Sequence, residues 1–303
     1  MDLSDRKELV WLSKLVRDVC AAVPAFRPLL VGAMARDLLL HYAHAVPIVR
    51  ATEDVDLAFA VADWGEFEAL RTALIDSHAF APTGPEHRLL YADHLPVDLI
   101  PFGGVEARDG SFTWPRDETE MGVLGYREAH ETAVELVLPA SQRISTVSLP
   151  MLAVLKLLAW SERHSAAPRK DATDLFLVLR NYLTEENSAR LYQQAAHLLE
   201  ADDFDYEAAG GWLAGHDAAS QIIACSPAPA RLFDKCEQVL SSETDPDGGL
   251  DLVAESHVDV TAGLHLLQMF FNGFRAGRDH HSIPPADSHG PGEWANRHVR
   301  TES

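Results

Sequence analysis

Cysteine, long apolar runs and positive charge are all scarce in this 303-residue chain. The three cysteines, Cys20, Cys225 and Cys236, are too few and too dispersed for a disulfide framework or a thiolate zinc site. No apolar run approaches the roughly 18 residues of a membrane span, because Lys156 interrupts the most apolar stretch at 149–160. The first ten residues are charged where a signal peptide needs an apolar segment. We therefore expect a cytoplasmic protein with no membrane association.

The charge balance is strongly acidic, with 25 basic and 46 acidic side chains and a net charge of −21. Residues 181–303 alone carry 7 basic and 20 acidic side chains. A surface of this sign repels polyphosphates, which excludes broad, sequence-independent binding of nucleic acids. Chemistry on phosphate groups then needs local basic groups or metal ions. One local basic patch exists at 151–180, with 5 basic and 3 acidic residues.

Hydrophobic periodicity changes along the chain and predicts an α+β fold. Residues 1–148 mix short apolar strands with helices, 149–278 form an all-helical domain, and 279–303 form a loose tail rich in proline, glycine and histidine. Asp63 is expected to begin a helix, with Glu66 as its capping-box partner. Residues 27–45 are expected to form a short apolar strand, a Gly-Ala turn and a helix. The other predicted helices are 5–23, 149–164, 170–183, 185–200, 227–241 and 257–277, and the other predicted strands are 54–61, 87–93, 97–103 and 134–140.

Three aspartates within apolar strands are the most informative feature. Asp54 and Asp56 are two residues apart, so in a strand both side chains project to the same face. Two carboxylates so close repel each other unless a cation lies between them, and their oxygens suit Mg²⁺ or Mn²⁺. Asp98 lies in a second strand of the same kind, VDLIPF. If the two strands are neighbours, the three acids form a two-metal site for in-line phosphoryl transfer.

An alternative interpretation of the same three residues needs no metal. Asp54 and Asp56 would then lie at an exposed strand start, and Asp98 would pair with an arginine. A basic residue in the space shared by the three carboxylates, or an Asp98 out of reach of the other two, would argue against the metal site and against the enzymatic interpretation that depends on it.

A strand-to-helix turn at Gly32–Ala33 precedes the acids. Small residues there let a phosphate approach backbone N–H groups at a helix N-terminus, where the dipole favours an anion. Arg36 and Asp37 follow in the first turn of the helix. They either form a structural ion pair or contact the substrate.

A second group of charges lies in the helical half. Lys156 falls on an apolar helix, and Asp171 and Asp174 are neighbours at i and i+3 on the next predicted helix. In a structural interpretation Lys156 extends its ammonium to the surface and Asp171 complements a helix dipole.

The order Gly-Ala, Asp-x-Asp, Asp resembles the polymerase-β-type nucleotidyltransferase superfamily. Within it, GAMARD, RATEDVDL and the later K-L-x-A-x-x-x-R and K-D-x-x-D-L segments are most similar to AbiEii-type nucleotidyltransferases of abortive-infection and type IV toxin–antitoxin pairs. The similarity covers about 27–182. It departs from the superfamily pattern at Ala33, where glycine or serine is usual, and in the long gap from Ala33 to Asp54.

The resemblance implies a nucleotidyltransferase fold, a mixed sheet with flanking helices, followed by a helical domain. It implies that Asp54, Asp56 and Asp98 hold Mg²⁺ or Mn²⁺. It further implies nucleotide contacts, ATP among the candidate nucleotides, and catalytic roles in the helical half. The nucleotide-binding residues would be Gly32, Ala33, Arg36, Thr52 and Lys156, and either Asp171 or Asp174 would position the acceptor or act as general base.

The function implied is transfer of a nucleoside monophosphate from an NTP to an acceptor hydroxyl. By resemblance, the acceptor is an RNA 3′ end, such as that of tRNA, or a protein side chain, and an antitoxin protein is a further partner. Two alternatives remain open: a small-molecule, aminoglycoside-type nucleotidyltransferase, which an acidic cleft would suit, and a non-catalytic binding module. A CCA-adding enzyme or poly(A) polymerase is disfavoured, because the acidic helical half lacks a basic surface for tRNA.

Overall fold

The computed structural model describes residues 1–48, 52–163, 169–185, 187–200 and 204–279. They form two compact units that divide between Ser148 and Leu149. The predicted tail at 279–303 lies outside the described residues after Asp279. No helix in the described part of the chain combines the length and apolar character needed to cross a lipid bilayer.

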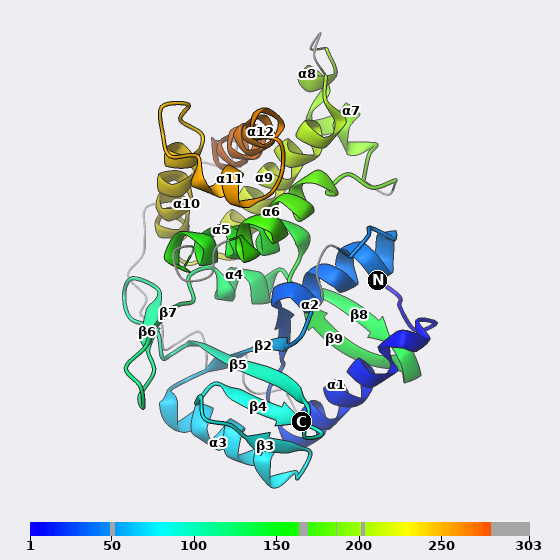
Figure 1. Cartoon of the computed structure of the whole chain (residues 1–303), viewed down its shortest axis with the longest axis vertical. Coiled ribbons are helices and arrows are strands. Elements are labelled where there is room, and N and C mark those ends of the chain that lie inside the picture. Colours follow the sequence, from blue (N-terminus) through cyan, green and yellow to red (C-terminus); the bar gives the residue numbers. More distant parts are fainter. Residues whose placement is uncertain (49–51, 164–168, 186, 201–203, 280–303) are drawn as a thin grey trace. The chain divides into compact units, whose positions relative to one another are not determined.

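The first unit is built on a mixed sheet, which in the described residues has the strand order β3-β4-β5-β2-β1-β9-β8 (Figure 1). The pairs β2–β5 and β1–β9 are parallel, and the other neighbours are antiparallel. The strands are β1 (Leu29–Val31), β2 (Val55–Val61), β3 (Phe80–Pro82), β4 (Arg88–Tyr91), β5 (Leu95–Gly103), β8 (Val134–Leu138) and β9 (Gln142–Thr146). A separate two-stranded sheet pairs β6 (Ser111–Thr113) with β7 (Glu120–Gly122).

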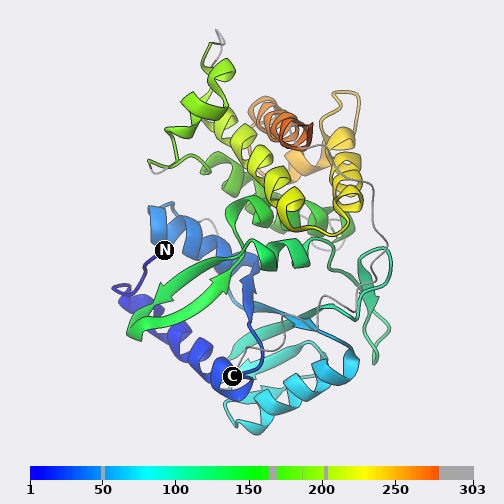
Figure 2. The same cartoon turned by 180° about the vertical axis from the view of Figure 1, so that it is seen from behind.

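Helices flank this sheet, and Figure 2 shows the β8–β9 hairpin from the other side. The mixed sheet with flanking helices confirms the predicted α+β class. The α-helix that begins at Gly32 ends at Arg36, and the chain continues directly into a π-helical segment that begins at Asp37. The helices are α1 (Val10–Ala22), α2 (Gly32–Arg36) with the π-helical η2 (Asp37–Tyr42), α3 (Trp64–Asp76) and α4 (Tyr126–Glu131), with short 3₁₀ turns η1 (Lys7–Leu9) and η3 (Pro139–Ser141).

The start of α3 has the predicted capping box. The Asp63 carboxylate accepts a hydrogen bond from the backbone N–H of Glu66 at 2.9 Å. The Glu66 carboxylate in turn accepts one from the backbone N–H of Ala62 at 2.5 Å. One N–H of the first helical turn, that of Glu66, is thereby satisfied, and the return bond from Glu66 goes to Ala62, the residue before the N-cap, rather than to Asp63 itself.

The second unit is entirely helical among its described residues. The prediction of one helix over 185–200 was wrong, because the chain breaks at Ala195 between two short helices. A 20-residue helix begins at Tyr206, inside an acidic stretch where no helix was predicted. The helices are α5 (Leu149–Arg163), α6 (Lys170–Arg180), α7 (Arg190–Gln194), α8 (Ala196–Leu199), α9 (Tyr206–Cys225), α10 (Pro229–Glu243), α11 (Asp251–Glu255) and α12 (Val260–Asp279).

Close packing of α9 on α12 forms the centre of this unit. A Cβ added at Gly215 would lie 2.0 Å from the carbonyl oxygen of Phe270, and one at Gly273 would lie 1.9 Å from that of Trp212. The two backbones therefore approach more closely than any residue larger than glycine allows.

A partly buried polar network ties α7 to α9. Asp217 accepts hydrogen bonds from the Tyr182 hydroxyl and from Arg190, whose Nη1 lies 2.7 Å from Oδ2. Burial alone would raise the pKa of Asp217, but hydrogen bonds from His216, Arg190 and Tyr182 outweigh burial and lower that pKa to about 2. The network therefore depends on an ionised Asp217.

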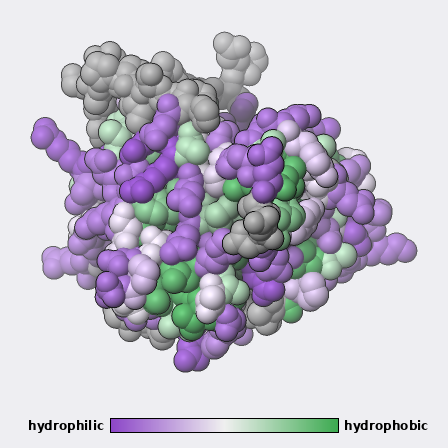
Figure 3. Space-filling model, turned by 90° about the horizontal axis from the view of Figure 1, so that it is seen from above, coloured by the Kyte–Doolittle hydropathy of each residue, from purple (hydrophilic) through white to green (hydrophobic). Residues whose placement is uncertain are grey.

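Hydrophilic side chains cover most of the face of the molecule seen in Figure 3, and hydrophobic ones appear there only in small areas.

Candidate active site

Strand register brings two of the predicted acids together. In the parallel pair β2–β5, Asp56 lies directly opposite Asp98. Directly opposite residues project to the same face of a sheet, so these carboxylates are neighbours. Asp54 precedes the first residue of β2 and, two residues before Asp56, is expected on the same face. The apolar residues between and around them, such as Val55 and Leu57, point into the core and are fully buried.

The turn into α2 lies against the Asp56 carboxylate. Val31, the last residue of β1, is paired with Asp56 across the antiparallel β1–β2 ladder. Gly32 follows with a φ of +69°, and a Cβ built on it would lie 1.9 Å from Oδ2 of Asp56. Both observations require glycine at this position. The Gly-Ala turn and the Asp-x-Asp pair, 22 residues apart in sequence, are therefore one local structure.

Arg88 is a part of this site that was not predicted from the sequence. It is the first residue of β4, and it lies opposite Asp98 in the antiparallel β4–β5 ladder. Its Nε and Nη2 donate hydrogen bonds to the two carboxylate oxygens of Asp98, at 2.6 and 2.7 Å. Nη2 also lies 3.4 Å from Oδ2 of Asp54. The hydrogen bond to Asp98 is the main reason that the pKa of Arg88 is raised above its usual value, and burial opposes it.

The arginine pairing expected in the alternative interpretation is thus observed for Asp98. In the part of the chain that the structure describes, no three histidine, cysteine or acidic side chains are grouped as metal ligands. Arg88 is therefore a basic residue in the space between Asp54 and Asp98, which is the arrangement that argues against the metal site. The same contacts show that these carboxylates lie close enough to share one cation, here the guanidinium. All the available donors are hard carboxylate oxygens, which suit Mg²⁺ or Mn²⁺.

Arg36 forms a structural ion pair. Its guanidinium is 1% exposed, and its Nε and Nη2 donate to Oδ1 of Asp37 at 2.9 and 2.6 Å. Thr52 donates its hydroxyl hydrogen to the other oxygen, Oδ2, at 2.5 Å. Through these contacts Asp37 connects the helix after Gly32 to the segment that enters β2. The predicted nucleotide contacts of Arg36 and Thr52 stay predictions.

Lys156, Asp171 and Asp174 form a buried ionic cluster within the helical unit. The Lys156 ammonium lies 3.0 Å from Oδ1 of Asp171 and 2.7 Å from Oδ2 of Asp174, and all three side chains are at most 6% exposed. Arg163 adds a two-pronged contact to Asp171 from the solvent side, at 2.7 and 3.0 Å. Burial raises the pKa of Asp171, but the charges of Lys156 and Arg163 outweigh it, and the resulting pKa lies below the usual value.

This cluster gives the three residues a structural role, the fixing of α5 against α6. A carboxylate with a lowered pKa and with both oxygens bonded is a weak base. For Lys156 to hold a phosphate, its ammonium would exchange a carboxylate partner for the phosphate. The phosphate and base roles therefore stay predictions.

Arg88 could not be found from local pattern. It lies 34 residues after Asp54 in HRLLYAD, a segment that predicts only a strand. The available signal was Asp98 itself, because a carboxylate within an apolar strand needs a partner. Which arginine supplies it depends on the β4–β5 register.

Comparison with known proteins identifies the family. No curated protein matches the chain in sequence. Two structures of the antibiotic-resistance factor ANT(2'')-Ia, one in solution and one in a crystal with adenylyl-2''-tobramycin, resemble it at 16% and 14% identity. The matches cover 62% of this chain and 95% and 99% of those chains, with a TM-score of 0.36 in both cases. The family described as nucleotidyl transferase AbiEii toxin, type IV TA system, matches residues 25–229. The chain therefore belongs to the AbiEii nucleotidyltransferase toxin family, and it is a nucleotidyltransferase.

Proposed function

We propose that the chain transfers a nucleoside monophosphate from an NTP to an acceptor hydroxyl, at a site formed by Asp54, Asp56 and Asp98. The observation that carries this proposal is the pairing of Asp56 with Asp98 across β2 and β5, directly beside the Gly32 turn. The pattern of acids in the sequence alone did not require these elements to meet.

In this proposal Mg²⁺ or Mn²⁺, held by the three carboxylates, would neutralise charge on the triphosphate. The backbone at Gly32 and Ala33 lies at the start of a helix and would face a phosphate with N–H groups. The acceptor oxygen forms a bond to the α-phosphorus, the bond to the β-phosphate oxygen breaks, and pyrophosphate leaves. The hydroxyl proton passes to a carboxylate of the site, for which Asp98 is positioned if Arg88 releases it.

Transfer of label tests this reaction. Purified protein is incubated with Mg²⁺ and each labelled NTP, once with total cell RNA and once with RNA-free lysate protein. The two arms separate an RNA 3′ end from a protein side chain as the acceptor. We expect Asp56→Asn to abolish transfer, because it removes a charge without changing the shape of the side chain.

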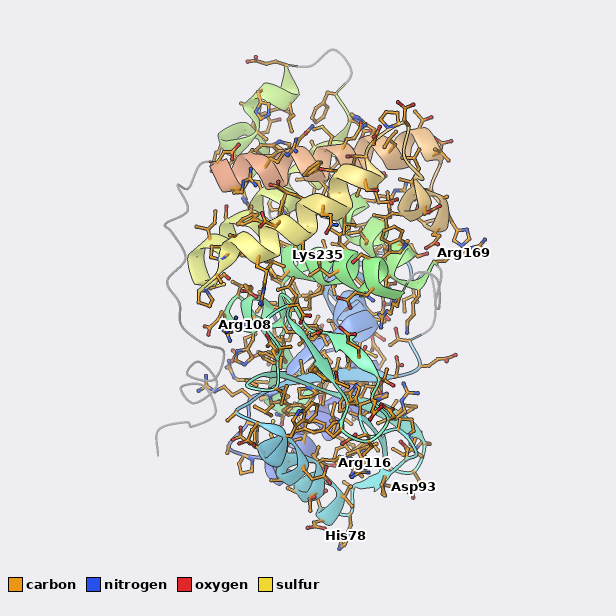
Figure 4. All side chains as sticks on the ribbon, turned by 90° about the vertical axis from the view of Figure 1, so that its left-hand side faces the viewer. His78, Asp93, Arg108, Arg116, Arg169 and Lys235 are labelled. Atoms are coloured by element: carbon orange, nitrogen blue, oxygen red, sulfur yellow. The ribbon has the colours of Figure 1, made fainter. Side chains whose placement is uncertain are left out.

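Asp93→Asn is the matched control. Asp93 is an exposed acid in the turn between β4 and β5, labelled in Figure 4, and it has a φ of +63° that asparagine tolerates. Its transfer activity is expected to equal that of the unchanged protein. Absence of metal-dependent transfer or NTP binding in the unchanged protein would refute the proposal.

We further propose that this activity is that of a cytoplasmic toxin with an antitoxin protein as its partner. The family description supports this role. Expression of the chain is expected to arrest growth, and the double substitution of Asp54 and Asp56 by asparagine is expected to abolish that arrest. Arrest by the double variant would refute a toxic activity that depends on this site.

A further inference from the structure

Arg88 competes for the oxygens that a metal ion would need. The predicted metal site consists of three aspartates, and the structure adds the guanidinium of Arg88 to it. Arg88, Asp98 and Asp56 lie side by side on three neighbouring strands, in the register Arg88–Asp98 and Asp98–Asp56. The guanidinium is therefore on the same face of the sheet as the carboxylates.

The segment that carries Arg88 is anchored on both sides. The Arg88 carbonyl accepts a hydrogen bond from the Thr83 hydroxyl at 2.7 Å, and its N–H donates to the Pro85 carbonyl at 3.2 Å. The next residue towards β3, His87, accepts a bond from the N–H of Leu99 at 2.8 Å. These contacts fix the backbone from which the guanidinium extends.

Glu86 supplies a buried anchor to the same segment. Its side chain is 7% exposed and pairs with Arg116, a residue labelled in Figure 4, at 3.7 Å. Its carbonyl accepts a bond from Nε of the buried Arg71 at 3.0 Å. These contacts fix the backbone of Arg88, and the two hydrogen bonds to Asp98 hold its guanidinium.

The Arg88 guanidinium and a divalent metal ion would repel each other if both were bound to these carboxylates. The guanidinium uses both oxygens of Asp98 and approaches one oxygen of Asp54. A divalent ion bound to the same oxygens at about 2 Å would lie within a few ångströms of the guanidinium, and the two cations would repel each other.

We propose that Arg88 is a tethered counter-ion that competes with the divalent metal for Asp98, so that full loading of the site requires Arg88 to release this carboxylate. This inference rests on the proposed function. In the metal-free site the guanidinium stabilises three carboxylates that would otherwise repel one another. Asp98, whose two oxygens both accept hydrogen bonds from Arg88, is the ligand whose availability Arg88 controls.

Titration of the full-length chain with Mn²⁺ alone tests the competition, with binding followed by electron paramagnetic resonance. We expect Arg88→Met to bind Mn²⁺ about tenfold more tightly than the unchanged protein, a coupling in the usual range for contacting charges. The control is Arg143→Met, which removes the same charge from an exposed pair with Glu135 at the β8–β9 edge. Its Mn²⁺ affinity is expected to stay within about twofold of the unchanged value.

A double-mutant cycle assigns the effect to Asp98. Asp98→Asn is expected to weaken Mn²⁺ binding little in the unchanged background, where Arg88 already occupies the carboxylate. In the Arg88→Met background the same substitution is expected to remove the whole gain. Thermal unfolding gives a second readout: Mn²⁺ should raise the Tm of Arg88→Met more than that of the unchanged protein.

The outcomes separate this inference from the proposed function. Equal or weaker Mn²⁺ binding by Arg88→Met overturns the competition but leaves a metal-dependent transferase intact. No Mn²⁺ binding by any variant overturns both. If Arg88→Met does not fold, Arg88→Gln provides the test, because glutamine removes the charge and keeps a polar side chain that can donate to Asp98. An Mn²⁺ affinity no tighter than that of the unchanged protein in Arg88→Gln then overturns the inference.

Discussion

Substitution of Gly32 by alanine probes the contact on which the site geometry depends. The added Cβ would lie 1.9 Å from Oδ2 and 2.8 Å from Cγ of Asp56, so the carboxylate has to move by more than an ångström. The φ of +69° adds backbone strain, which costs about 1–3 kcal/mol for a residue with a side chain. The displaced carboxylate and the backbone strain should both lower the stability of the first unit.

We expect Gly32→Ala to lower stability by about 1–3 kcal/mol and transfer activity by about a hundredfold. The loss of activity exceeds the loss of folded protein, because displacement of a catalytic group by about 1 Å is enough to cost this factor. Stability is measured by thermal unfolding, and activity by transfer of labelled nucleotide at a temperature where the variant is folded.

Gly84→Ala is the matched control for this prediction. No heavy atom lies within 4 Å of a Cβ built on Gly84, and its φ is outside the positive range. Stability and transfer are expected to stay close to those of the unchanged protein. If Gly32→Ala also kept both its Tm and its activity, the packing of Gly32 on Asp56 could not be what positions the carboxylate.

Three further predictions concern stability. Lys156→Met leaves Asp171 and Asp174 buried without their shared ammonium and should cost about 3–5 kcal/mol, measured by denaturant unfolding; a cost below about 1 kcal/mol would contradict the ionic cluster. The pKa of Asp217 is about 2 in the folded protein, so its contribution of about 2–3 kcal/mol is present above the unfolded value near 4 and is lost as the pH falls towards 2. Asp217→Asn should flatten that acid-side slope in unfolding scans, and an unchanged slope would exclude Asp217 as its source. Asp63→Ala should destabilise α3 by about 1 kcal/mol, which hydrogen exchange of the first turn can detect.

The sequence was sufficient for the parts of the site that depend on local pattern. The Gly-Ala turn, the alternation of Asp54 and Asp56, and the capping box at Asp63 each follow from neighbours a few residues apart. The α+β class followed from a change in periodicity. Such features can be predicted because the direction of each side chain follows from its position within its own helix or strand.

The rest depends on pairings between distant segments. That β5 lies beside β2, and that β4 brings Arg88 onto Asp98, is decided by strand order and register. The buried partners of Lys156 were visible in the sequence as nearby charges, but their burial was not. The break at Ala195 has no strong signal such as proline or glycine, and this explains the wrong prediction of a single helix there.

The alignment of β5 with β2 also makes the site sensitive to changes in chain length. An insertion or deletion of one residue between Leu95 and Asp98 would turn Asp98 towards the core and bring Val97 or Leu99 to the surface beside Asp56. The same change in the exposed turn at Asp93 would leave the ladder in place. Length variation among natural relatives should therefore be tolerated in that turn and rejected within the few residues of β5 before the aspartate.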